Sequence, residues 1–97
     1  MKPLNLEKAL QLYTIIGKHL PENPEIDMEI IDFVGTIVDS IVEQEEHPIL
    51  VQSIVLMSGM QISDVRMLEI DHITKLFVEG LLINRVTELK EFCKSLD

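Results

Sequence analysis

The side chains that could do chemistry in this sequence are few, and most are histidines beside carboxylates. His47 follows Glu45 and Glu46, and His72 follows Asp71. A metal site needs several ligands that converge on one point, usually at turn spacing or at the i, i+4 spacing of a helix. Adjacent residues on a helix point apart, so neither pair presents both of its side chains to one point. The sequence therefore predicts neither a metal site nor a cofactor.

The single cysteine, Cys93, lies on an apolar helical face near the end of the last predicted helix. An activated cysteine needs a nearby base or a helix N-terminus, so Cys93 is expected to act as a small hydrophobic side chain. The sequence also lacks a glycine-rich phosphate loop, a Ser–His–Asp candidate and a cysteine pair. We therefore expect a protein that is not an enzyme.

The elements that would position any site are predicted to be helices. Apolar spacing and helix-end signals indicate an all-α fold, a small single-domain bundle over residues 1–97 with a long C-terminal helix. Asn5 is expected to cap the first helix, and the Asn-Pro-Glu run at 23–25 to start the second. Pro48 should open the third helix, Gly59 should close it, and Asp71 should cap the last. We expect four or five helices near residues 6–20, 24–44, 48–58, 63–68 and 71–95, and no sheet.

The last predicted helix has two apolar faces as far as Asn84 and one apolar face beyond it. Its first half has the pattern of a buried helix, so Phe77 is expected in the core. Its second half is expected to project and to lay its single stripe on another chain. The alternative is that this stripe packs on the first helix of the same molecule. The partner-binding residues predicted on the stripe are Val86, Leu89, Phe92, Cys93 and Leu96.

Three of the five methionines, Met57, Met60 and Met67, cluster around the turn between the third predicted helix and the last. Methionine side chains repack easily, so this group could form an adaptable binding surface for a partner. The alternative is that the three side chains fill the core.

Acidic residues are concentrated in the middle of the 97-residue chain, whose formal net charge is −9. No Lys or Arg occurs between Lys18 and Arg66. Such a surface repels phosphate groups, so binding to nucleic acid or to an anionic membrane is not expected. It could attract a basic protein, although its simplest role is to keep an apolar chain soluble. The carboxylates in this gap are Glu22, Glu25, Asp27, Glu29, Asp32, Asp39, Glu43, Glu45, Glu46 and Asp64.

The composition indicates a folded protein of the cytoplasm. The chain is 46% hydrophobic, which argues against disorder. A lone cysteine cannot form an internal disulfide, and the N-terminus has no apolar core of a secretory signal. No apolar run approaches the about 18 residues that span a bilayer. We therefore expect a soluble cytoplasmic protein.

A family resemblance covers residues 50–84, which read LVQSIVLMSGMQISDVRMLEIDHITKLFVEGLLIN. An apolar helix ends in the small-residue turn Ser58-Gly59, and a short capped helical turn follows from Ser63 to Leu68. Asp71 then opens a long helix whose fully apolar part ends at Asn84. This pattern resembles the tail assembly chaperones of phages with siphovirus-type tails.

The resemblance implies a non-enzymatic assembly factor. Such chaperones coat the long, helical tape measure protein and release it as tail tube subunits assemble. The implied partners are the tape measure protein and, as a second candidate, the major tail tube protein. The resemblance also implies a homo-oligomer in the host bacterial cytoplasm.

Two other functions remain open. The first is an acidic inhibitor or nucleic-acid mimic, in which the carboxylates of the second helix bind a basic partner. Binding by charge should weaken steeply with ionic strength, whereas apolar binding should not. The second is a small structural homodimer without a client.

Overall fold

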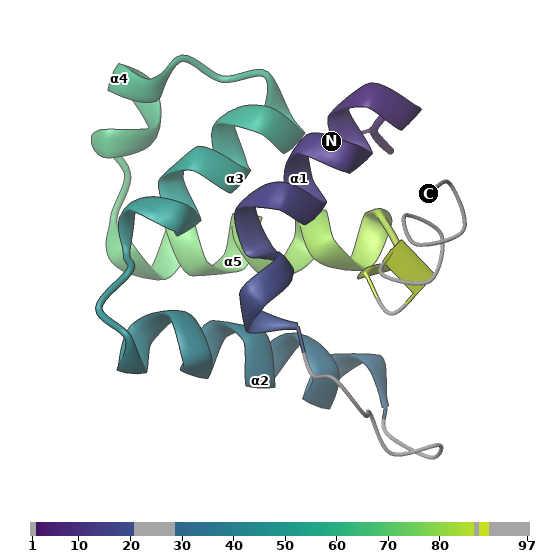
Figure 1. Cartoon of the computed structure of the whole chain (residues 1–97). Coiled ribbons are helices and arrows are strands. Elements are labelled where there is room, and N and C mark those ends of the chain that lie inside the picture. The colour runs from purple at the N-terminus through teal and green to yellow at the C-terminus, as the bar shows by residue number, and fades with distance from the viewer. Residues whose placement is uncertain (1, 21–28, 87, 90–97) are drawn as a thin grey trace.

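The computed structural model describes residues 2–20, 29–86 and 88–89. Over these residues the chain forms five α-helices, one 3-10 turn and no strand, which confirms the predicted all-α class (Figure 1). The elements in chain order are α1 (Leu6–Ile16), η1 (Gly17–His19), α2 (Ile30–Glu43), α3 (Pro48–Ser58), α4 (Ile62–Arg66) and α5 (Ile70–Ile83).

The central helix is α3, which packs against α1, α4 and α5 (Figure 1). Helix α2 lies at one edge of the bundle, where it packs against α5 and η1. Phe77 of α5 is completely buried, as the sequence predicts. All five helices contribute to one core of apolar side chains, namely Leu12, Ile16, Leu20, Phe33, Val34, Ile37, Ile41, Leu50, Ile54, Met57, Val65, Phe77, Leu81, Val86 and Leu89.

Local signals account for several helix ends. The Asn5 side chain accepts a hydrogen bond from the backbone N–H of Lys8 at 2.9 Å, which satisfies a free donor at the start of α1. Pro48 occupies the first turn of α3, where its missing N–H costs nothing. Gly59 ends α3 with φ of 75°, a left-handed conformation that favours glycine. These three predictions are confirmed.

Other predicted boundaries are wrong. The first helix ends at Ile16 and tightens into η1, rather than continuing to residue 20. Glu29 is extended, so α2 begins at Ile30; the predicted start at residue 24 lies outside the described residues. The predicted cap Asp71 lies inside the first turn of α5, because the extended residue before this helix is Glu69. Its carboxylate still faces the positive end of the helix dipole.

The largest correction concerns the last helix, which is not continuous to residue 95. Helix α5 ends at Ile83, and Arg85 has a positive φ of 50° that breaks the helical path. The Asn84 side chain donates to the Gly80 carbonyl at 2.8 Å and accepts from the Leu4 N–H at 2.8 Å. Asn84 therefore satisfies the end of α5 and fastens it to the start of the chain.

Candidate functional site

The C-terminal stripe does not project where the structure describes it. Val86 is completely buried and Leu89 nearly so, and both belong to the core. Leu89 lines a hollow of about 420 Å³ together with Pro3, Leu4 and Ala9. The expectation that Val86 and Leu89 are exposed is therefore wrong, because this part of the chain folds back beside the N-terminal segment. The structure supports the alternative in which the stripe packs within the molecule.

The other three residues predicted on that stripe, Phe92, Cys93 and Leu96, lie outside the described residues. Their predicted contact with a partner stays a prediction.

The three clustered methionines have different environments. Met57 is buried in the core at the end of α3, so it is a packing residue in this monomer. Met60 is half-buried and packs against the edge of the core. Met67, the residue that ends α4, is 85% exposed. Of the three, Met67 is therefore the side chain that is freely available to a partner.

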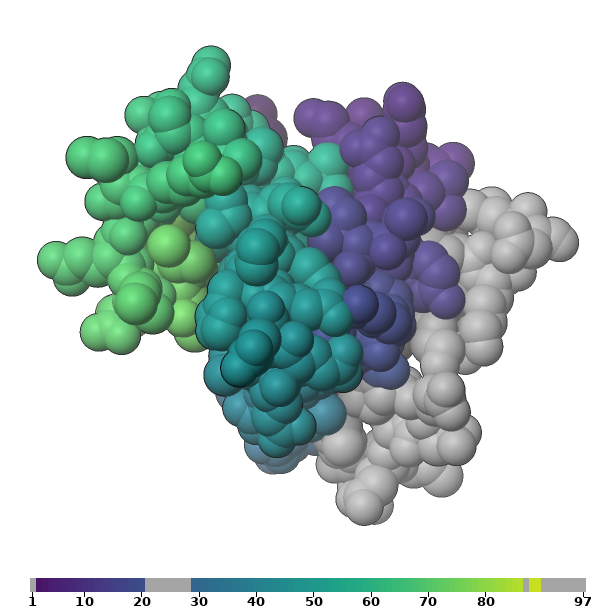
Figure 2. Space-filling view, turned by 60° about the vertical axis from the view of Figure 1, so that its left-hand side comes forward, coloured from purple at the N-terminus to yellow at the C-terminus, as the bar shows by residue number. Residues whose placement is uncertain are grey.

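Two other exposed apolar side chains lie within eight residues of Met67 along the chain, at the starts of α4 and α5. Ile62 at the start of α4 is 47% exposed, and Ile70 at the start of α5 is 81% exposed. Figure 2 shows the green residues of this part of the chain standing out at the left side of the molecule. We call Ile62, Met67 and Ile70 the α4 surface. Among the described residues, the other exposed bulky hydrophobic side chains are Leu6, Leu10, Ile30, Ile31 and Val42.

The length of α4 explains why these side chains are exposed. The helix has only five residues and buries one of them, Val65, in the core. A single turn of helix can direct one side chain inward while its ends remain outside. A hollow of about 260 Å³ adjoins Ile62 and is lined also by Pro48, Val51 and Arg66. The α4 surface therefore combines protruding apolar side chains with a shallow depression beside them.

Sequence reasoning identified Met67 but not Ile62 or Ile70. The sequence did contain a signal of their exposure. Ile62 and Ile70 lie on either side of a short segment that contains the polar residues Ser63, Asp64 and Arg66. A helix as short as α4 can bury few side chains, so Ile62 at its start remains outside the core.

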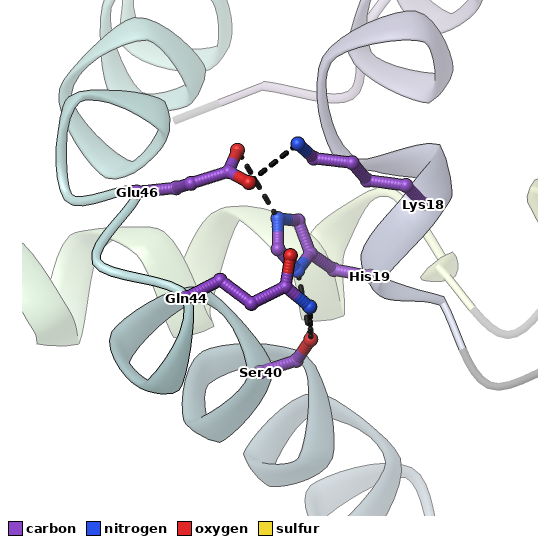
Figure 3. Close-up of polar contacts among 5 residues, drawn as sticks. All are labelled: Lys18, His19, Ser40, Gln44 and Glu46. Carbon is purple, nitrogen blue, oxygen red and sulfur yellow. Dashed lines mark hydrogen bonds and ion pairs between the residues drawn. The ribbon is translucent and has the colours of Figure 1, made fainter.

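A second group of side chains joins three segments through polar contacts (Figure 3). His19 of η1 is buried, and its Nδ1 atom lies 2.8 Å from the Ser40 hydroxyl of α2. The Gln44 amide donates to the same hydroxyl at 3.3 Å. Glu46, in the turn between α2 and α3, forms an ion pair with Lys18 and has its Oε2 atom 3.6 Å from His19 Nε2. We call Lys18, His19, Ser40, Gln44 and Glu46 the polar brace.

Ser40 and Glu46 hold the two ring nitrogens of His19 between them. The Ser40 hydroxyl accepts from Gln44, and it donates to or accepts from His19 Nδ1 according to the imidazole tautomer. The hydrogen bond and the positive charge of Lys18 lower the pKa of the Glu46 carboxyl below its ordinary value. His19 links η1 to α2 and to the following turn.

The polar brace contains a serine, a histidine and a carboxylate, which are also the residue types of a nucleophilic triad. Here the imidazole is buried and the serine hydroxyl already accepts a hydrogen bond from Gln44. The 3.6 Å separation between His19 Nε2 and Glu46 is longer than a hydrogen bond. The geometry fits a contact that holds η1, α2 and the α2–α3 turn together.

Within the described residues, no three His, Cys, Asp or Glu side chains gather closely enough to hold a metal ion. His47 and His72 are both exposed. No helix in the described part of the chain has the length and apolar character required to cross a membrane.

Comparison with known proteins assigns no family. No protein-family model matches the chain, and no match is found among curated proteins or among solved structures. The case for a function therefore rests on the chain's own residues and surfaces.

Proposed function

We propose that the protein is a non-enzymatic phage tail assembly chaperone that binds the tape measure protein through the α4 surface. The single observation that carries this proposal is the exposure of Met67 and Ile70, at 85% and 81%, beside the half-exposed Ile62. The resemblance to tail assembly chaperones supports it, because residues 50–84 include most of α3 and all of α4 and α5. The proposal places the protein in the host bacterial cytoplasm, as a homo-oligomer.

Exposed apolar surface is costly in water, so it needs a reason. Exposed hydrophobic side chains that gather at one place often mark a contact with another molecule. A chaperone that keeps an aggregation-prone client in solution needs such a contact on a body that is itself soluble. The net charge of −9 supplies that solubility, because strongly charged proteins repel one another.

The chemistry of the α4 surface suits a helical client. An amphipathic helix offers apolar side chains at i, i+3, i+4 and i+7, which can be received by a group of protruding and recessed apolar positions. Methionine adds adaptability, since its unbranched side chain can adjust to different neighbours along a long client. The hollow lined by Pro48, Val51 and Ile62 provides the recessed position.

The test is co-expression with a helical segment of the tape measure protein from the same genome. The client segment should remain soluble with the wild-type protein and precipitate with a Met67→Asp, Ile70→Asp variant, because an unpaired carboxylate in an apolar contact is costly. Leu6→Asp on α1 is the matched control, as it places the same charge at another half-exposed apolar position. Equal client solubility with all three proteins would overturn the proposal.

One observation favours the acidic inhibitor as a second candidate. The segment from Glu29 to Glu46 contains six carboxylates and no Lys or Arg. If these charges alone bind the partner, raising the salt concentration should release it, and the α4 variants should bind normally. Salt-resistant binding that is lost in the α4 variants would favour the chaperone.

A further inference from the structure

Helix α2 has a second apolar face besides the one that it buries. Its core face consists of Phe33, Val34, Ile37 and Ile41. A separate row of apolar residues and one glycine recurs at the helical spacing i, i+4, i+7 and i+11. This row lies roughly a third of a turn around the helix from the core face. We call this row the outer stripe of α2; it comprises Ile31, Gly35, Val38 and Val42.

The outer stripe is open to solvent along most of its length. Ile31 is 54% exposed and Val42 is 47% exposed, at opposite ends of the helix. Gly35 is half-buried, and a Cβ atom added there would meet no atom of the described residues within 4 Å, so the middle of the stripe has room for a further side chain. Val38 is partly buried at the edge of the core. Figure 1 shows α2 at the margin of the bundle, so a helix could lie along its outer side without meeting α3 or α4.

Carboxylates follow one edge of this stripe. Asp32, Asp39 and Glu43 are exposed and recur at i, i+7 and i+11, which aligns them on one ridge beside the apolar row. None of the three forms an ion pair with a described residue. Because no Lys or Arg occurs between Lys18 and Arg66, nothing on α2 itself neutralises this edge.

We propose that the outer stripe of α2 docks an amphipathic helix of a basic partner protein. The apolar side chains of that helix would pack on Ile31, Val38 and Val42. Its Lys or Arg side chains would lie along the ridge of Asp32, Asp39 and Glu43. The open position at Gly35 leaves room for one bulky side chain of the partner to approach the α2 backbone.

The acidic ridge favours a basic helix over a second copy of the same chain as the binding partner of the outer stripe. Two α2 helices packed antiparallel through their outer stripes would bring their acidic ridges together. Like charges placed opposite each other in this way are unfavourable, and α2 has no basic residue to offset them. A helix with Lys or Arg along one edge converts the same ridge into attraction. This surface is separate from the α4 surface, so the inference does not depend on the proposed chaperone function.

The experiment is a binding selection on the whole protein with a library of helical peptides of about 18 residues, slightly longer than α2. Each peptide has a fixed apolar stripe, and the positions flanking the stripe vary among Lys, Glu, Gln and Ala. We expect selected peptides to be enriched in Lys along one flank. Their affinity should fall about tenfold or more for an Ile31→Ser, Val42→Ser variant, because both apolar anchors are removed.

Two further variants make the outcome decisive. The first is a triple variant that neutralises the acidic ridge: Asp32→Asn, Asp39→Asn, Glu43→Gln. It should lose the preference for Lys-containing peptides but keep the part of the affinity that comes from apolar contacts. Its peptide binding should also depend less on salt. Leu6→Ser, Leu10→Ser is the matched control, because it removes two exposed apolar side chains of α1 that belong to neither surface, and it should bind the selected peptides as the wild type does. Thermal melts of every variant identify any loss of folding.

Three results would overturn the inference: selection of no peptide, enrichment of Glu instead of Lys, or unchanged binding by the folded Ile31→Ser, Val42→Ser variant. A dimer of the wild type that this variant dissolves would show instead that a second copy occupies the stripe. Peptide binding that is lost in a Met67→Ser, Ile70→Ser variant would place the site on the α4 surface and would also contradict the inference.

Discussion

The two ends of α5 show how neighbouring segments decide whether an apolar side chain is buried or exposed. At its start, Ile70 and the preceding Met67 face solvent, whereas just beyond its end Val86 and Leu89 are buried. The difference lies in the neighbouring segments. The end of α5 is fastened to the beginning of the chain through the Asn84 side chain and the Leu4 N–H. The start of α5 follows α4, which directs only Val65 into the core.

This comparison separates side chains that stabilise the fold from side chains that are free to bind. Burial of an apolar side chain stabilises the folded state, and an exposed one contributes little until a partner covers it. Substitutions at the two ends of α5, and in the core between them, should therefore change different measured quantities.

The largest expected effect is on the stability of the core between the two ends. Phe77→Ala should lower the free energy of unfolding by about 3–5 kcal/mol, through lost burial and the cavity that remains. Met67→Ala, at an exposed position, should change it by less than about 0.5 kcal/mol. Urea denaturation of both variants measures the difference. Coinciding denaturation curves for Phe77→Ala and the wild type would contradict the position of Phe77 in the core.

A smaller effect is expected from the contact that covers the end of α5. Asn84→Ala removes the bonds to Gly80 and Leu4 and should cost about 1–2 kcal/mol, because both partners are partly buried. Thr74→Ala is the matched control, since the Thr74 hydroxyl also bonds to a carbonyl four residues earlier but is exposed. Equal losses of stability in the two variants would show that the link to Leu4 is unimportant.

These two predictions also indicate what could be foreseen from the sequence. The start of α1 and both ends of α3 were predictable because Asn5, Pro48 and Gly59 act on their own backbone within a few residues. The end of α5 was not, because Asn84 meets a backbone group 80 positions away. A helical pattern shows that a face is apolar, but it does not show whether another segment of the chain covers that face.

The same limit applies to the candidate sites. The apolar character of Leu89 and Met67 was evident in the sequence, yet the first is buried and the second exposed. The polar brace was missed because His19 and Ser40 are 21 positions apart and come together only when η1 packs on α2. The core position of Phe77 was predictable, since the first half of the last helix is apolar on two sides.

The smallest expected effect concerns pH and the polar brace. Because Lys18 lowers the pKa of Glu46, folding favours the charged carboxylate. The contribution of this pair to stability is present above the ordinary pKa of 4.5 and is lost as the pH falls through the lower value of the folded state. In Lys18→Gln, NMR titration should show the pKa of Glu46 returning towards its ordinary value.

The matching stability measurement compares melting temperatures of the wild type and Lys18→Gln across the same pH range. The difference should be small, since the pair lies at the surface, and should shrink as the pH falls below 4.5. A difference that stays constant with pH would show that Lys18 acts through its packing and not through its charge.

The most direct test of the central claim is a titration of a purified helical tape measure segment against the wild type, Leu89→Asp and Met67→Asp, with a thermal melt of each protein. If the α4 surface binds the client and Leu89 is part of the core, Met67→Asp should melt as the wild type does and lose affinity about tenfold or more. Leu89→Asp should lose its cooperative melt. A folded Leu89→Asp that fails to bind, beside a Met67→Asp that binds normally, would contradict the account and return the binding surface to the C-terminal stripe.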